Sequence, residues 1–110
     1  MTNEKLLVQL NKLHACEEAV VWVGDRDLPS AWAECERADW MLWLAGKMSD
    51  KEGWPTRQEV VLAACACART ALKFVKQGEN RPLMAIETAE RWANGLATLE
   101  EVRLAAAAAD

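Results

Sequence analysis

The chain has 110 residues, 52% of them hydrophobic, and carries a formal net charge of −4. This length and apolar fraction predict one folded domain, residues 1–110, with a modest core, and they argue against a disordered chain. Residues 15–39 hold seven acidic and two basic residues, whereas residues 40–110 hold nine of each sign. Because nucleic-acid binding needs a basic stripe, this local acidity argues against a nucleic-acid partner.

The sequence indicates neither membrane insertion nor secretion. No apolar run approaches the roughly 18 residues of a membrane span. Residues 1–5, Met-Thr-Asn-Glu-Lys, lack the basic flank and the small-residue cleavage site of a signal peptide. We therefore expect a cytoplasmic protein whose four cysteines are reduced.

Abundant alanine, leucine and glutamate, with few glycines and prolines, predict an all-α fold. Residues 2–3 can cap a first helix that carries a stripe of leucines. A second helix starts near His14 and ends at Gly24, which stands in the usual glycine position past a last turn. Asp27 is a suitable N-cap for a third helix that extends to about Cys35.

Residues 32–44 contain three of the six tryptophans and are the most distinctive stretch of the chain. Residues 40–45 have no polar side chain on any face, which predicts a short helix, about residues 38–47, with neighbours on every side. The tryptophans that lie on apolar helix faces are expected to be core residues: Trp22, Trp40, Trp43 and Trp92.

The second half of the chain predicts three further helices. A polar loop, residues 49–55, precedes a capping box at Thr56 that opens the longest helix, which is expected to end near Gln77. Pro82 begins a helix that extends to about residue 93. A second capping box at Thr98 opens the last helix, whose alanine-rich end is expected to fray.

Two segments of the chain resemble each other. Residues 15–22 and 85–92 share an Ala, Glu, Ala and Trp pattern, and in each case a glycine turn and a helix cap follow. Two copies are too few for an open solenoid. We therefore predict a compact, single-domain, all-α bundle of about six helices, in which two similar helical hairpins surround the tryptophan-rich central helix.

No arrangement of residues predicts an active site or a metal site. Cys65 and Cys67 are two residues apart on a helix, so their side chains point about 200° apart. Cys16 and Cys35 have no zinc-like spacing, and His14 is the only histidine. The single glycines form no phosphate-binding loop. We expect a protein that is not an enzyme and that needs no metal or other cofactor.

Two features outside the apolar pattern call for an explanation. Arg69 lies within the apolar part of the longest predicted helix, and a buried arginine requires an acidic partner, for which we predict Asp39. Trp54 stands in the polar loop, where it either folds back over the core or serves as an exposed anchor for a partner.

Three motifs resemble a known family. They are Ala-Trp-x-x-Cys-x-Arg-Ala-Asp-Trp-Met-Leu-Trp-Leu at residues 31–44, Ala-Cys-Ala-Cys-Ala-Arg at 64–69 and Ala-Thr-Leu-Glu-Glu-Val-Arg at 97–103. Over about residues 10–108 the chain resembles the Imm-5-like immunity proteins, small helical proteins of bacteria and their phages. The resemblance implies a binding or neutralising role without naming a target, and it supplies no catalytic residues.

The sequence favours a non-enzymatic protein that neutralises a toxin or a bacterial defence effector by stoichiometric contact, as anti-CRISPR proteins do. A basic partner such as a nuclease fits the local acidity. The expected contact residues are Glu17, Glu18, Asp25, Asp27, Glu34, Glu36 and Trp54.

Two alternative functions and the oligomeric state stay open. The first alternative is a small-ligand (nucleotide) binder or sponge with an apolar cleft lined by tryptophan and by Arg37 or Arg69. The second is a structural phage protein, which predicts a large symmetric assembly. A homo-oligomer is compatible with each of these functions.

Overall fold

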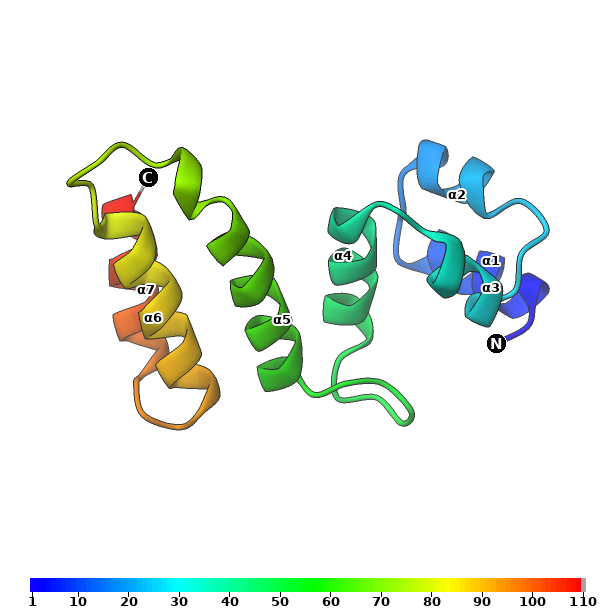
Figure 1. The fold of residues 1–110 in the computed structure, drawn as a ribbon. Coiled ribbons are helices and arrows are strands. Elements are labelled where there is room, and N and C mark those ends of the chain that lie inside the picture. Colours follow the sequence, from blue (N-terminus) through cyan, green and yellow to red (C-terminus); the bar gives the residue numbers. More distant parts are fainter. Residues whose placement is uncertain (110) are drawn as a thin grey trace. The chain divides into compact units, whose positions relative to one another are not determined.

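The structure is a computed structural model that describes residues 1–109. Within these residues the chain forms seven α-helices and one 3₁₀ turn, with no strand (Figure 1). The all-α prediction is confirmed, with seven helices where about six were expected. The chain divides into two compact units, unit 1 (Met1–Lys47) and unit 2, which begins at Met48. A single domain therefore stays a prediction.

Unit 1 begins with α1 (Asn3–Lys12), which Thr2 caps as expected, by accepting a hydrogen bond from the backbone N–H of Lys5. The side-chain amide of Asn3 donates to two backbone carbonyls, those of Gly24 at 2.9 Å and Arg26 at 2.7 Å. These bonds attach the start of α1 to the turn that follows the second helix.

Three more helices complete unit 1, and their positions follow the predicted pattern. They are α2 (Glu17–Val23), α3 (Leu28–Glu34) and α4 (Ala38–Met48). Asp27 caps α3 by accepting a hydrogen bond from the N–H of Ser30 at 2.9 Å. The buried apolar residues of this unit are Leu6, Leu10, Val23, Ala31, Leu44 and Ala45.

The tryptophans of unit 1 are not core residues, contrary to the prediction. Trp43 is 38% exposed, and Trp22 and Trp40 are only half-buried. In α4 it is Leu44, Ala45 and Met48 that are buried. An apolar helix face therefore does not guarantee that other side chains fill the space in front of it.

Unit 2 contains α5 (Arg57–Thr70), a 3₁₀ turn (Leu72–Phe74), α6 (Arg81–Ala93) and α7 (Leu99–Ala109). Helix α6 packs against both α5 and α7. Cys65 on α5 and Thr88 on α6 are buried, and the Thr88 hydroxyl donates to the carbonyl of Met84 at 2.7 Å. Trp92, another predicted core residue, is half-buried.

Helix α5 ends at Thr70, seven residues before the predicted end at Gln77. The Thr70 hydroxyl donates to the carbonyl of Cys67 at 2.6 Å, a local bond that competes with helical hydrogen bonding. The chain then tightens into the 3₁₀ turn and becomes extended at Val75. The apolar pattern alone could not locate this end.

The two similar sequence segments do not form similar hairpins. Helices α2 and α3 have seven residues each, whereas α6 and α7 have 13 and 11. Of these two helix pairs, only α6 and α7 pack closely along each other. The likeness of the two segments therefore reflects their shared helical composition and turn chemistry rather than a repeated hairpin.

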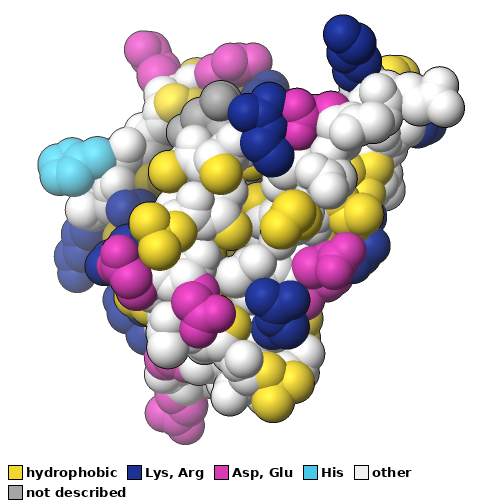
Figure 2. All heavy atoms as spheres, turned by 90° about the vertical axis from the view of Figure 1, so that its left-hand side faces the viewer, with side chains coloured by type: hydrophobic (Ala, Val, Ile, Leu, Met, Phe, Trp, Pro, Cys, Tyr) yellow, Lys and Arg dark blue, Asp and Glu magenta, His cyan; other side chains and the backbone are white. Residues whose placement is uncertain are grey.

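Exposed hydrophobic side chains also occur in unit 2, among them Phe74, Leu96 and Leu104. Figure 2 views the molecule from the side where Figure 1 draws α6 and α7, and it shows hydrophobic side chains dispersed among acidic and basic ones. Dispersed apolar residues are normal on a protein surface. They do not define a binding patch on this face.

The capping box of α5 provides a first test of the fold. The Thr56 hydroxyl accepts a hydrogen bond from the N–H of Glu59 at 3.1 Å, and the Glu59 carboxylate accepts one from the N–H of Thr56 at 3.0 Å. Replacing Thr56 with alanine should lower the free energy of unfolding by about 1 kcal/mol, measured by urea denaturation. Thr56→Ser keeps the hydroxyl and is the control. Equal stability of the two variants would show that the cap contributes nothing.

Candidate functional site

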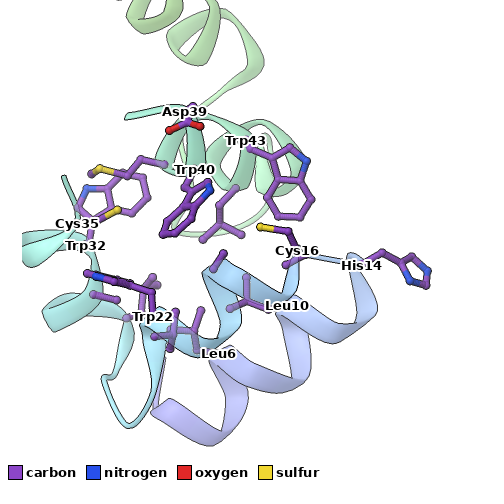
Figure 3. Close-up of a pocket in the computed structure, with 17 residues that line it drawn as sticks. Leu6, Leu10, His14, Cys16, Trp22, Trp32, Cys35, Asp39, Trp40 and Trp43 are labelled. Atoms are coloured by element: carbon purple, nitrogen blue, oxygen red, sulfur yellow. The ribbon is translucent and has the colours of Figure 1, made fainter. Parts of the chain in front are cut away.

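Unit 1 contains an apolar pocket with a volume of about 490 Å³ (Figure 3). All four helices of the unit contribute to its lining. Leu6 and Leu10 of α1 lie at its base, and both are buried. Pockets of roughly 300–1,000 Å³ are typical of small-molecule sites.

Four tryptophans form the walls of this pocket. Trp22 comes from α2, Trp32 from α3, and Trp40 and Trp43 from α4. In Figure 3, Trp22 and Trp32 lie on one side of the pocket, and Trp40 and Trp43 lie on the other. The rings of Trp22 and Trp40 are tilted by 59° with their centroids 6.3 Å apart. The indole rings are therefore spread around the pocket instead of filling it.

A guanidinium group covers one face of Trp22. The Cζ atom of Arg26 lies 4.3 Å from the ring centroid, a cation–π distance. Arg26 also donates to the backbone carbonyl of Trp22, and its Nε donates to the Glu34 carboxylate at 2.6 Å. The positive charge of Arg26 is therefore compensated by Glu34.

Trp40 carries a second guanidinium, that of Arg37, with Cζ 4.3 Å from the ring centroid. Arg37 donates two hydrogen bonds to the Asp39 carboxylate, at 2.9 and 2.7 Å, and its Nη1 lies 3.8 Å from Glu18. The hydrogen bond from Arg37 lowers the pKa of Asp39 below its ordinary value. Arg37 is thus also compensated.

Three acidic side chains within residues 15–39 have neither an ion pair nor a helix-capping role. Glu17, Asp25 and Glu36 are exposed, and none of them forms an ion pair within residues 1–109. Glu17 follows Cys16 in the chain and Glu36 follows Cys35, and both cysteines line the pocket. Next to the pocket lining, two carboxylates therefore have no cation, and one cation, Lys47 over Trp43, has no carboxylate within ion-pair distance among the described residues.

The predicted contact residues separate into two groups. Asp27 and Glu34 have structural partners, and the hydrogen bond from the Ser30 N–H lowers the pKa of Asp27. The carboxylates of Glu17, Asp25 and Glu36 are directed to solvent, with Glu18 only weakly paired. Trp54 is half-buried and belongs to unit 2, not to the acidic unit.

The predicted Asp39–Arg69 ion pair is replaced by two other pairs. Asp39 binds Arg37, two residues away, whereas Arg69 on α5 donates to Glu90 on α6 at 2.9 and 2.6 Å. The hydrogen bond from Arg69 lowers the pKa of Glu90. Asp39 and Arg69 are thus each paired with a residue of their own unit.

All four cysteines are free thiols, and burial raises the pKa of Cys65. Among the described residues no group of three or more His, Cys, Asp or Glu side chains is placed to hold a metal ion. His14 is exposed, and Figure 3 shows its ring directed away from the pocket. No helix of residues 1–109 is long and apolar enough to span a membrane.

Fold and site together define a small, all-helical protein with a tryptophan-walled pocket in an acidic unit. No protein-family model, no curated protein and no solved structure matches the chain. The resemblance to the Imm-5-like immunity proteins therefore stays a prediction that depends on the three sequence motifs.

Proposed function

We propose that the protein is a non-enzymatic binding protein that neutralises a target protein by stoichiometric contact. Immunity proteins and phage-borne inhibitors of toxins or of bacterial defence effectors, including anti-CRISPR proteins, act in this way. The observation that carries the proposal is the set of exposed, unpaired carboxylates within residues 15–39 of unit 1: Glu17, Asp25 and Glu36. The partner is a basic protein such as a nuclease.

The charge distribution favours this type of partner for a physical reason. Complementary charge accelerates the encounter of two proteins and penalises partners of the wrong sign. The two arginines within residues 15–39 are held by carboxylates of the same unit, so they do not offset the remaining acids. The acidic surface therefore attracts a basic partner. This attraction decays over the Debye length, which is about 8 Å at physiological ionic strength.

Charge reversal tests the contact surface. In the variant Glu17→Lys/Asp25→Lys/Glu36→Lys, we expect the amount of partner captured from a lysate of the source organism to fall at least tenfold, because three attractive charges become repulsive. Capture is measured by quantitative mass spectrometry on the tagged protein. The loss should shrink as salt is added. Asp27 and Glu34 are left unchanged, because they cap α3 and bind Arg26.

The matched control reverses three exposed acids of unit 2: Glu52, Glu87 and Glu100. This variant changes the net charge by the same amount and should retain the partner. If both variants capture the same proteins as the unmodified chain, the contact lies elsewhere. If the unmodified chain enriches no protein over the tag alone, the neutralising function is rejected.

The pocket of unit 1 supports a second candidate, a small-ligand binder. Its volume of about 490 Å³ lies in the range of small-molecule sites, and its walls are aromatic, as is common in such sites. Such a function does not require the acidic surface to contact a protein. The two candidate functions therefore depend on different parts of unit 1: the acidic surface for a protein partner and the pocket for a small ligand.

A further inference from the structure

We propose that the pocket of unit 1 binds a lipophilic organic cation, that is, an aromatic or branched apolar molecule with a quaternary or delocalised positive charge. The inference rests on the second candidate function, the small-ligand binder, and names the chemical class of its ligand. It depends on the pocket's lining and on the charges next to that lining. It also depends on the pairing of Arg26 and Arg37 with carboxylates, because an anionic ligand would need these arginines.

The lining of the pocket favours a ligand that is mostly apolar. Leu6 and Leu10 form the base, and four indole rings form the walls. A ligand that enters removes this apolar surface, and its own, from water, which is the main source of affinity in such pockets. The spread of the rings around the pocket suits a bulky body better than a single flat ring.

The indole rings also attract positive charge. Trp22, Trp40 and Trp43 each have a cation over the ring face: Arg26 and Arg37 at 4.3 Å, and Lys47 at 5.9 Å from the centroid of Trp43. Trp is the strongest cation–π partner among the side chains, and cages of aromatic rings bind quaternary ammonium groups in other proteins. A ligand cation in the pocket meets further indole surface.

The charges next to the lining favour the same sign. Glu17 and Glu36 adjoin the pocket-lining Cys16 and Cys35, and no described cation pairs with either carboxylate. Both side chains are exposed, so they act through the field at the pocket rather than through a buried contact. Three cations lie over the ring walls, and the carboxylates beside the pocket outnumber them: Glu17, Glu18, Glu34, Glu36 and Asp39 against Arg26, Arg37 and Lys47. The summed field therefore favours a cation over an anion.

A phosphate-bearing ligand has no free arginine at this pocket. Nε and Nη2 of Arg37 donate to Asp39, and Nε of Arg26 donates to Glu34. The phosphate of a nucleotide would therefore compete with a bound carboxylate at each arginine. The alternative arginine of the sequence analysis, Arg69, is bound to Glu90 in unit 2.

Two probe ions of similar size and shape but opposite charge test the proposal. Tetraphenylphosphonium is a lipophilic cation, and tetraphenylborate is the corresponding anion. In calorimetric titrations of the full chain at low salt, we expect the phosphonium ion to bind at least tenfold more tightly. This preference should decrease as salt is added, because the deciding charges are exposed.

A pocket-filling variant locates the bound ion. Ala19 lines the pocket and is half-buried, so Ala19→Phe places a ring in the space that the ion needs and should abolish binding. Ala66→Phe makes the same change at an exposed position of α5 and should leave binding unchanged. Circular dichroism shows whether each variant is folded.

A second measurement needs no variant. Cys16 is an exposed thiol that lines the pocket, whereas Cys67 is an exposed thiol of unit 2. Bound phosphonium should slow the reaction of Cys16 with N-ethylmaleimide at least fivefold and leave Cys67 unaffected, as measured by mass spectrometry of the two peptides. Protection of both thiols or of neither would overturn the location.

The outcomes separate the inference from the function on which it rests. Tetraphenylborate that binds as tightly as the phosphonium ion, with Cys16 protected, would overturn the cation class while the small-ligand binder stands. If neither ion binds nor protects Cys16, the inference and the small-ligand binder both fail. Binding that survives Ala19→Phe would place the ion outside the pocket and overturn the site.

Discussion

Replacing Leu6 with alanine is expected to lower the free energy of unfolding by about 2–3 kcal/mol. Leu6 is 2% exposed and is the largest fully buried side chain among the described residues. The truncation removes three carbons from the core, at about 0.8 kcal/mol for each buried methylene equivalent. The space left behind opens into the existing pocket, so the additional penalty for an enclosed cavity is small, and the lower part of the usual range applies.

Urea denaturation followed by tryptophan fluorescence measures this loss. Val8→Ala is the matched control, because Val8 lies on the same helix, α1, and is 48% exposed. We expect that substitution to change the free energy of unfolding by about 0.5 kcal/mol or less. Equal effects of the two substitutions would mean that Leu6 does not belong to the core of unit 1.

The starts of the helices could be predicted from the sequence because they depend on local chemistry. Thr2, Asp27 and Thr56 each accept a hydrogen bond from a backbone N–H three residues ahead, so a short pattern contains the whole interaction. The end of α5 at Thr70 could not be predicted in this way. There the apolar pattern continues, and the geometry changes at a side-chain bond that the pattern does not reveal.

The tryptophans show a second limit of the sequence pattern. Apolar spacing placed Trp22, Trp40 and Trp43 on one side of their helices, and the structure agrees in directing them to a common region. The pattern cannot distinguish a filled core from a walled pocket, because both present the same residue types. Whether space remains between rings depends on the tilt and separation of helices that lie apart in the sequence.

The two ion pairs show how distance along the chain affects prediction. Arg37 and Asp39 are two residues apart, so little additional chain must be ordered for them to meet, and this local pair displaces the more distant partner that was predicted. Arg69 and Glu90 are 21 residues apart and meet only because α5 packs on α6. That partner follows from tertiary structure and from no local motif.

The second large effect is expected at Gly24, where Gly24→Ala should lower the free energy of unfolding by about 1–3 kcal/mol. Gly24 ends α2 with φ 53° and ψ −116°, a combination that favours glycine at a turn. A Cβ atom there would lie 3.7 Å from the nearest carbonyl oxygen, that of Val21, which is an ordinary contact. The cost therefore comes from backbone strain and not from a clash.

Gly46→Ala is the control and should act in the opposite direction. Gly46 lies inside α4 with open space where a Cβ would stand, so alanine should raise the free energy of unfolding by about 0.5–1 kcal/mol. Both substitutions add the same methyl group and restrict the unfolded chain to the same extent. The difference between the two measured free energies thus isolates the strain at Gly24. It also reports the rigidity of this turn, because the side-chain amide of Asn3 donates to the Gly24 carbonyl at 2.9 Å. If both substitutions stabilise the protein, the turn relaxes freely, and the attachment of α1 to it does not fix the geometry of unit 1.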